Sequence, residues 1–233
     1  MSMSKKQELR EKRAKQDRTQ RILTIVGVSI VALAIALMLI LPTLQPVGAI
    51  VEHPSMNRPQ VKFNAMGDPN APVKIIEYSD FQCPYCAHFV VQTEQQIIDA
   101  YIATGKVYFE YHSFGDFIGV ESGRAAEAAY CAGDQNKFWE MHDIIFANQN
   151  GENAGGFTDK RLTAFAGKIG LDAGTFNDCF TSGKYVNQLK QDGVEATQSG
   201  VKATPSFVIN GKLIEGAQAF AAFQTEIDAL LKK

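Results

Sequence analysis

The stretch Phe81-Gln82-Cys83-Pro84-Tyr85-Cys86-Ala87-His88-Phe89 places two cysteines two residues apart, where an apolar strand pattern gives way to a helical one. The preceding run, Val73–Tyr78, is rich in β-branched residues and is typical of a strand. Apolar residues then recur at helical spacing at Val90, Ile97, Ile98, Tyr101 and Ile102. We therefore expect Cys83 at or just before the first helical turn, where the missing N–H of Pro84 is not needed.

Cys83 at a helix start would lie where unsatisfied N–H groups and the helix dipole stabilise an anion, so its thiolate should form below the free-thiol pKa of about 8.5. We expect Cys83 to be an exposed nucleophile and Cys86, one turn further, to be shielded. Half of a zinc site and an ordinary structural disulfide are the alternatives. Zinc would need a second C-x-x-C or an H-x-x-x-H, and the sequence has neither.

The composition is that of a folded protein with a charged N-terminal end. The 233 residues are 45% hydrophobic and 10% aromatic, which is ample for a packed core and excludes a disordered chain. Residues 1–21 hold eight Lys or Arg and three acidic residues, whereas the remainder holds 15 basic and 22 acidic residues. The acidic remainder excludes a nucleic-acid-binding surface, and we expect 1–21 to form a basic cytoplasmic tail.

Residues 22–41 form an uncharged run of twenty residues, long enough to span a hydrocarbon core of about 30 Å as one transmembrane helix. Basic residues precede this run and the next one is Arg58, so the positive-inside tendency places the C-terminal domain outside the cytoplasm. A cleaved signal peptide is the alternative, because Val47-Gly48-Ala49 resembles a cleavage site. The run exceeds the usual signal length of about 7 to 15 residues, so we favour a single-pass anchor in the cell membrane.

Six of the eight prolines lie within residues 42–72, which show little hydrophobic periodicity. We assign residues 42–60 to a semi-extended linker. Val61–Phe63 is a candidate for a short edge strand at the start of the globular part.

After this proline-rich segment only Pro84 and Pro205 remain. Pro205 opens a strand pattern that reaches Asn210-Gly211, a two-residue hairpin turn, and a returning strand follows. A cis peptide bond before Pro205 would be a specific structural feature of the backbone. The alternative is a trans proline that simply ends a loop.

The remaining patterns give the order of the elements. Val107–Tyr111 is a third strand candidate, several helical patterns follow it, and Phe220–Leu231 is a last amphipathic helix. The order is β, α, β, several helices, β, β, α. The opening β-α-β unit requires a parallel strand pair with a right-handed crossover.

Together these features resemble the thioredoxin-fold proteins, in particular the DsbA-like thiol oxidoreductases with an inserted helical domain. The resemblance covers residues 61–233, with the insertion at about 117–200, and rests on the Cys83–Cys86 motif, on Thr204-Pro205 before a strand, and on the helices between them. It implies an α/β thioredoxin fold, here preceded by a single N-terminal transmembrane helix. It also implies that Cys83 is the nucleophile, Cys86 its buried partner, and Thr204-Pro205 a cis-proline loop that binds the substrate backbone.

Members of this family often carry a buried acid six residues before the first cysteine, and Glu77 occupies that position. The resemblance implies a raised pKa for Glu77 and a proton relay to Cys86. If the strand phase were shifted by one residue, Glu77 would face solvent and lose this role.

Together with the anchor expected at residues 22–41, the resemblance implies a membrane-anchored thiol:disulfide oxidoreductase that introduces disulfides into thiol-containing exported proteins. It further implies reoxidation by a quinone-linked membrane protein of the DsbB or vitamin K epoxide reductase type, with no cofactor. A disulfide isomerase or reductase in the same compartment is one alternative. A copper- or thiol-binding module is another, but only His88 is near enough in sequence to add a ligand.

Cys131 and Cys179 both lie on helical patterns within the insertion. Since Cys83 and Cys86 account for one pair and an oxidising compartment favours closure of the other, we expect a structural disulfide between them. Two separate buried thiols are the alternative.

The aromatic residues near the motif and in the insertion have two expected roles. Phe81, Tyr85 and Phe89 are candidates for an apolar peptide-docking surface around the cysteines. Phe138 and Trp139 follow a helical pattern and are expected in the core of the insertion.

Overall fold

The computed structural model of the chain describes residues 5–44, 47–52, 56–114 and 117–232. It divides into two compact units, Met1–Gly48 and Ala49–Lys233. In the described part of the first unit the chain forms one long helix, α1 (Lys5–Leu44). Its segment Arg18–Leu41 contains an 18-residue window with a mean hydropathy of 2.8, and the segment is long and apolar enough to cross a membrane.

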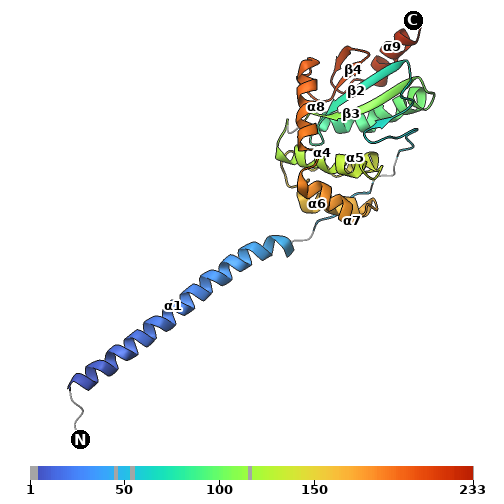
Figure 1. Cartoon of the computed structure of the whole chain (residues 1–233). Coiled ribbons are helices and arrows are strands. Elements are labelled where there is room, and N and C mark those ends of the chain that lie inside the picture. Colours follow the sequence, from blue (N-terminus) through green and yellow to red (C-terminus); the bar gives the residue numbers. More distant parts are fainter. Residues whose placement is uncertain (1–4, 45–46, 53–55, 115–116, 233) are drawn as a thin grey trace. The chain divides into compact units, whose positions relative to one another are not determined.

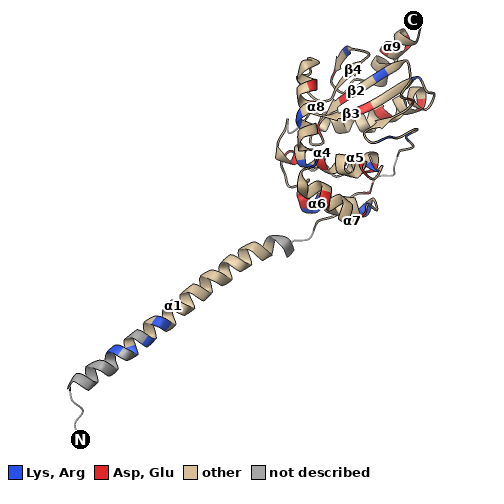
Figure 2. Cartoon of the chain, viewed as in Figure 1, with Lys and Arg blue, Asp and Glu red and all other residues tan. Residues whose placement is uncertain are grey.

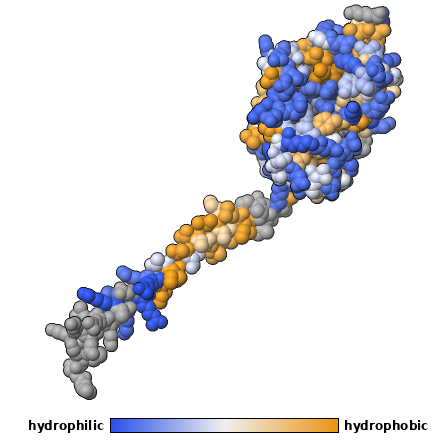
Figure 3. Space-filling model, viewed as in Figure 1, coloured by the Kyte–Doolittle hydropathy of each residue, from blue (hydrophilic) through white to orange (hydrophobic). Residues whose placement is uncertain are grey.

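The polar and apolar parts of α1 are separated along its length. Arg13, Lys15, Arg18 and Arg21 precede the apolar part (Figure 2). Side chains from 22 to 41 form an exposed hydrophobic band (Figure 3). One apolar N-terminal helix is therefore present, as the sequence predicted.

The second unit is built on a five-stranded sheet in the order β1-β3-β2-β4-β5 (Figure 1). Its strands are β1 (Ala65–Met66), β2 (Val73–Ser79), β3 (Val107–Ser113), β4 (Ser206–Ile209) and β5 (Lys212–Glu215). β2 and β3 are parallel, and the other neighbouring pairs are antiparallel. This is the thioredoxin-like α/β arrangement that the sequence predicted, with β2 at the centre.

The turn between β4 and β5 follows from its two residues. Asn210 and Gly211 both have positive φ, 43° and 88°, which a tight two-residue hairpin requires. The Asn210 side chain also accepts a hydrogen bond from the backbone N–H of Lys74 at 2.7 Å. The hairpin is thereby attached to the first residues of β2.

One continuous helical stretch connects β2 to β3 and provides the crossover. It comprises α2 (Pro84–Phe89), the π-helical η1 (Val90–Glu94), α3 (Gln95–Ile97) and the π-helical η2 (Ile98–Ile102). Phe89 packs against Phe207 of β4, with ring centroids 4.5 Å apart. This contact fixes the start of the helix against the centre of the sheet.

Among the described residues between β3 and β4, five helices form the helical insertion: α4 (Val120–Gly133), α5 (Phe138–Ala147), α6 (Asp159–Lys168), α7 (Ala173–Ser182) and α8 (Val186–Gln198). α4 and α5 lie between the sheet and the pair α6 and α7 (Figure 1). Phe138 and Trp139 of α5 are 0% and 2% exposed, so their predicted place in the core is confirmed. The last helix, α9 (Phe220–Leu231), packs Phe223 against Phe207.

Two sequence-based boundaries differ from the structure. The edge strand is Ala65–Met66 and not Val61–Phe63, because Phe63 has a φ of 55° and turns the chain back. The second unit begins at Ala49, inside the expected linker 42–60, and Val51 hydrogen-bonds Asn148 of the segment after α5. Residues 45–46 and 53–55 of that linker lie outside the described residues.

Cys131 of α4 and Cys179 of α7 are joined by a disulfide in the structure, with Cα atoms 5.8 Å apart. The bond ties the two layers of the insertion together across 48 positions of the sequence. A long closed loop restricts the unfolded chain, so the bond favours the folded insertion.

Replacing both cysteines, C131S with C179S, is expected to lower the free energy of unfolding by about 4 kcal/mol. Trp139 is the chain's one tryptophan and is buried beside α4, so its fluorescence during denaturant unfolding of the full-length chain measures the change. The double variant C83S/C86S keeps this bond and is the matched control. An unfolding midpoint equal to that of the control would contradict a stabilising bond.

Candidate active site

The two cysteines of the motif lie at the junction between β2 and α2. Cys83 caps α2 and its backbone N–H donates to the Asp80 carbonyl at 3.0 Å. The Asp80 carboxylate accepts bonds from the Gln82 N–H and the Ser122 hydroxyl, both at 2.7 Å. Gln149 Nε2 donates to the Cys83 carbonyl at 3.2 Å. The turn is thus fixed by side chains of the insertion as well as by its own backbone.

Cys83 is 5% exposed, which differs from the expected exposed nucleophile. The cause is the loop at Thr204, whose carbonyl oxygen lies 3.3 Å from Cys83 Sγ and accepts a bond from the thiol. A hydrogen bond from the Cys86 thiol, assisted by the Thr204 side chain and by backbone N–H groups of the first turn, outweighs burial and lowers the pKa of Cys83 to about 6.

Cys86 has the opposite character. It is 0% exposed, and burial raises its pKa well above that of a free thiol. The neighbouring charges of Cys83 and Glu77 raise it further. The two sulfurs therefore differ strongly in how readily each carries a negative charge.

The peptide bond between Thr204 and Pro205 is cis, and both residues are buried. The Pro205 carbonyl accepts a bond from the Gly216 N–H at 2.8 Å, which ties the loop to the end of β5. Ser206 pairs with Tyr78 of β2 in the sheet, so the residues just before Ser206 lie beside the end of β2. The structure thus brings the predicted Thr204-Pro205 loop to the predicted nucleophile.

Glu77 lies on the buried face of β2 and is 1% exposed, so the strand phase is the one that turns it inward. Neither carboxylate oxygen has a hydrogen-bond partner among the described residues. Burial, and after it the charge of Glu94, raises the pKa of Glu77 to about 8. Glu77 is therefore protonated at neutral pH.

The expected apolar docking surface is wrong for two of its three aromatic residues. Phe81 and Phe89 are 0% exposed and belong to the core. Phe81 stacks on Tyr111, and Phe89 packs on the sheet. Tyr85 is 67% exposed and stands at the surface between the two cysteines.

Sequence reasoning missed the polar residues that surround the motif. Asp80 and Gln149 support its backbone, but their spacing in the sequence carries no recognisable pattern. Arg58, Glu94 and Asp143 form a buried ion-pair group in the same core. One sequence signal could have indicated this buried ion-pair group: Glu94 is a charged residue inside an apolar helical pattern.

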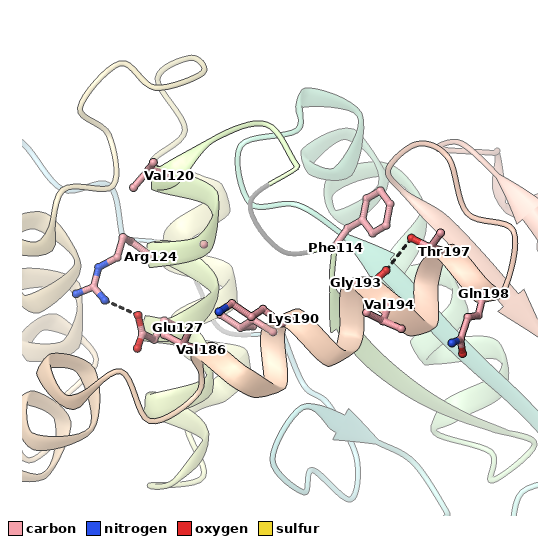
Figure 4. A pocket seen from close by; sticks show the side chains of 12 residues that line it. Phe114, Val120, Arg124, Glu127, Val186, Lys190, Gly193, Val194, Thr197 and Gln198 are labelled. Carbon is pink, nitrogen blue, oxygen red and sulfur yellow. Dashed lines mark hydrogen bonds and ion pairs between the residues drawn. The ribbon is translucent and has the colours of Figure 1, made fainter.

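A separate groove of about 650 Å³ lies between α4 and α8 (Figure 4). Phe114, Val120, Val186 and Val194 give it apolar walls, with the Arg124–Glu127 ion pair at one end. Neither cysteine of the motif and no residue of the Thr204-Pro205 loop lines it. The groove is therefore not part of the candidate active site.

The described residues contain no group of three or more His, Cys, Asp or Glu side chains arranged to hold a metal ion. The arrangement instead suits sulfur exchange. One sulfur is a stable thiolate, its partner is buried, and an acid that holds a proton at neutral pH lies in the same core.

Comparisons with known proteins place this geometry in a family. Residues 61–229 match a family model described as Thioredoxin. The probable disulfide bond formation protein D of Bacillus anthracis is 30% identical over 173 residues, which cover 72% of this chain and 78% of that protein. The crystal structure of oxidised BdbD from Bacillus subtilis superposes with a TM-score of 0.68 at 22% identity, covering 78% of this chain and all of that one.

A longer protein also matches over the same region. The Na(+)/H(+) antiporter NhaA 1 of Salinispora arenicola is 30% identical over 165 residues, which cover 69% of this chain but only 24% of the antiporter. The chain thus spans about a quarter of that relative. The family model and the Bacillus anthracis relative show that the chain belongs to the thioredoxin-like DsbA/BdbD family of thiol-disulfide oxidoreductases.

Proposed function

We propose that this protein is a membrane-anchored oxidase that introduces disulfide bonds into exported proteins through Cys83 and Cys86. The observation that carries the proposal is the contrast between the two sulfurs, since the pKa of Cys83 is lowered and that of Cys86 is raised. A stabilised Cys83 thiolate favours the reduced form of the pair. The oxidised form is then a strong acceptor of electrons from substrate thiols.

The reaction proceeds in two exchanges. A substrate thiolate attacks Cys83 Sγ, a bond forms between these two sulfurs, and the Cys83–Cys86 bond breaks. Cys86 leaves as a thiolate and takes a proton from the Glu77 carboxyl group. The second substrate thiolate then attacks the substrate sulfur of the mixed disulfide, so that a substrate disulfide forms and Cys83 leaves as its stable thiolate.

The Thr204-Pro205 loop is proposed to bind the substrate backbone beside the exchanging sulfurs. The Thr204 carbonyl oxygen lies 3.3 Å from Cys83 Sγ, at the place where a peptide attached to Cys83 would run. An extended peptide offers N–H groups to such an acceptor, as in strand addition to a sheet edge. Tyr85, exposed between the two cysteines in the sequence, is proposed to provide an apolar contact.

A reductase or isomerase would use the same residues in the opposite direction, and the pKa of Cys83 distinguishes them. Lowering that pKa raises the reduction potential of the pair, which favours oxidation of substrates. The turnover then requires a partner that removes two electrons. We propose a quinone-linked membrane protein of the DsbB or vitamin K epoxide reductase type, with no cofactor bound by this chain.

Helix α1 supports a proposal for the location of the protein. Its segment Arg18–Leu41 is long enough to span a bilayer, and basic residues stand on its N-terminal side. We propose that this helix stays attached as an anchor in the cell membrane and that the second unit lies outside the cytoplasm. An oxidising compartment also agrees with the Cys131–Cys179 disulfide.

The Cys86 thiol is expected to control the ionisation of Cys83. In reduced protein, C86A removes the hydrogen bond that contributes most to the low pKa, so the midpoint should rise from about 6 by about one to two pH units. C86S provides a hydroxyl group that can donate a hydrogen bond to the Cys83 thiolate. It should therefore bring the pKa of Cys83 most of the way back to its wild-type value. Thiolate absorbance against pH measures both, and equal midpoints in C86A and wild type would contradict this account.

The reduction potential tests the oxidase direction. Equilibration of the full-length chain with glutathione buffers should give a value well above the roughly −270 mV of thioredoxin, because the reduced form is stabilised. In C86A, oxidised glutathione converts the Cys83 thiol to a mixed disulfide, and a thiolate of a reduced, unfolded protein then displaces glutathione. C86A should therefore accumulate a disulfide between Cys83 and that protein, whereas C83S should form none. A potential at or below that of thioredoxin would show a reductase instead.

Fractionation tests the anchor. The expected product sediments with membranes after a high-salt wash and retains residues 22–41, because the apolar band is longer than a cleaved signal. Mass measurement of the mature chain gives its N-terminus. A soluble product that begins near Ile50 would rule out the anchor.

A further inference from the structure

Arg58 forms a buried ion pair with two acids from different helices. Its Nη2 lies 3.0 Å from Glu94 Oε1, and its Nη1 and Nη2 each lie 2.7 Å from the Asp143 carboxylate. The three side chains are only 1–2% exposed. Asp143 also bonds His142 Nδ1 at 2.9 Å. Arg58 thus joins the crossover helix at Glu94 to α5 at Asp143.

Glu77 lies on the sheet face that these two helices cover. Its neighbours in the sheet are Tyr111 of β3 and Phe207 of β4. Phe207 packs against Phe89 of the crossover helix, and Tyr111 packs against His142 of α5. Glu77 is therefore enclosed by the elements that Arg58 connects.

Cys86 and Glu94 lie on one face of the crossover helix. Cys86, Val90 and Glu94 are spaced four residues apart and are 0%, 4% and 1% exposed. A π-helix has more residues per turn than an α-helix. In the π-helical segment Val90–Glu94, residues four positions apart therefore lie close to the same side of the helix. The buried face of the crossover helix therefore places both Cys86 and Glu94 in the same core.

The free oxygen atoms of the two glutamates are unsatisfied. Both oxygens of Glu77 and Oε2 of Glu94 are buried without a hydrogen-bond partner among the described residues. Arg58 compensates Glu94 through Oε1, so Glu94 is the acid that carries the charge. A negative charge on Glu77 would be repelled by the charge of Glu94 in this buried environment. Protonation of Glu77 avoids that repulsion.

Given the proposed thiol exchange, we propose that Glu94, held by Arg58, is a positioning residue that keeps a proton on Glu77 for delivery to the Cys86 thiolate. Glu94 acts on Glu77 through its charge and does not touch the reacting sulfurs. Arg58 keeps that charge in place within the core.

Arg58, Tyr111, Asp143 and the two cysteines keep their charge states around pH 8, where Glu77 titrates. Burial raises the pKa of Tyr111 well above its ordinary value, so Tyr111 stays neutral. Arg58 stays charged, and hydrogen bonds from His142 and Arg58 outweigh burial and lower the pKa of Asp143. On the crossover helix, Cys83 ionises near pH 6 and Cys86 far above neutrality. Removal of the Glu94 charge therefore acts mainly on Glu77.

The test measures protonation of Glu77 directly in the reduced full-length chain, kept in solution with a mild detergent. Infrared difference spectroscopy follows the C=O stretch of a protonated carboxyl group against pH, and its absence in E77Q assigns the band. Wild type should titrate with a midpoint near pH 8. E94Q removes the repelling charge and should lower the midpoint by about one pH unit.

Two variants serve as controls. D99N makes the same acid-to-amide change at an exposed position of the same helix and should leave the midpoint unchanged. E94D keeps the charge and should restore most of the wild-type value. Should E94Q not fold, the triple variant R58M/E94M/D143M replaces the whole ion-pair group by apolar side chains, a change that cores often tolerate. The midpoint should again fall, because Glu94 affects Glu77 more than Arg58 does.

A second measurement separates this inference from the proposed function. In single-turnover oxidation of a dithiol peptide, the first exchange should slow above pH 8 in wild type and at a lower pH in E94Q. If no variant oxidises the peptide but E94Q still lowers the Glu77 midpoint, the proposed function fails and the coupling stands. An unchanged midpoint in folded E94Q, or an equal shift in D99N, overturns the inference.

Discussion

A stable thiolate at the first turn of a helix is the constraint on which the rest of this structure depends. Cys83 follows the central strand β2 and caps the helix α2, and β2 lies between β3 and β4 in the sheet. Because β4 runs antiparallel to β2, the residues that enter β4 meet the end of β2, and Thr204-Pro205 necessarily faces Cys83. The insertion completes the arrangement, since Gln149 holds the backbone of the turn.

The features that could be predicted from the sequence are those with local signals. The junction at Cys83 follows from a change of hydrophobic period within a few residues, and the β4–β5 hairpin follows from Asn210-Gly211. The order of the elements then limits the sheet to a few topologies. The covering of Cys83 could not be predicted, because it depends on a loop 121 positions away. Phe81 and Phe89 were misjudged for the same reason, since the strands and helices that bury them are distant in sequence.

The ion-pair group shows a second limit of sequence reasoning. Arg58 lies within a proline-rich segment that has little hydrophobic periodicity and was therefore assigned to a linker, yet its side chain is 2% exposed. Its partners Glu94 and Asp143 are 36 and 85 positions away. A buried charge is acceptable only when its partners are in place, so its burial becomes visible only once the fold is known.

The two sulfurs require opposite surroundings, and one helix meets both requirements. Its first turn offers N–H groups that favour the charge on Cys83, whereas one turn later the chain is inside a core that disfavours charge on Cys86. In the proposed exchange, the departure of Cys86 as a thiolate is therefore the costly step, and an acid must supply a proton there. The burial that disfavours a Cys86 thiolate also raises the pKa of Glu77 and so keeps it protonated. In the proposed mechanism, burial makes Cys86 a poor leaving group and also keeps the proton on the acid that would serve it. Cys83 leaves without such help because hydrogen bonds stabilise its own thiolate.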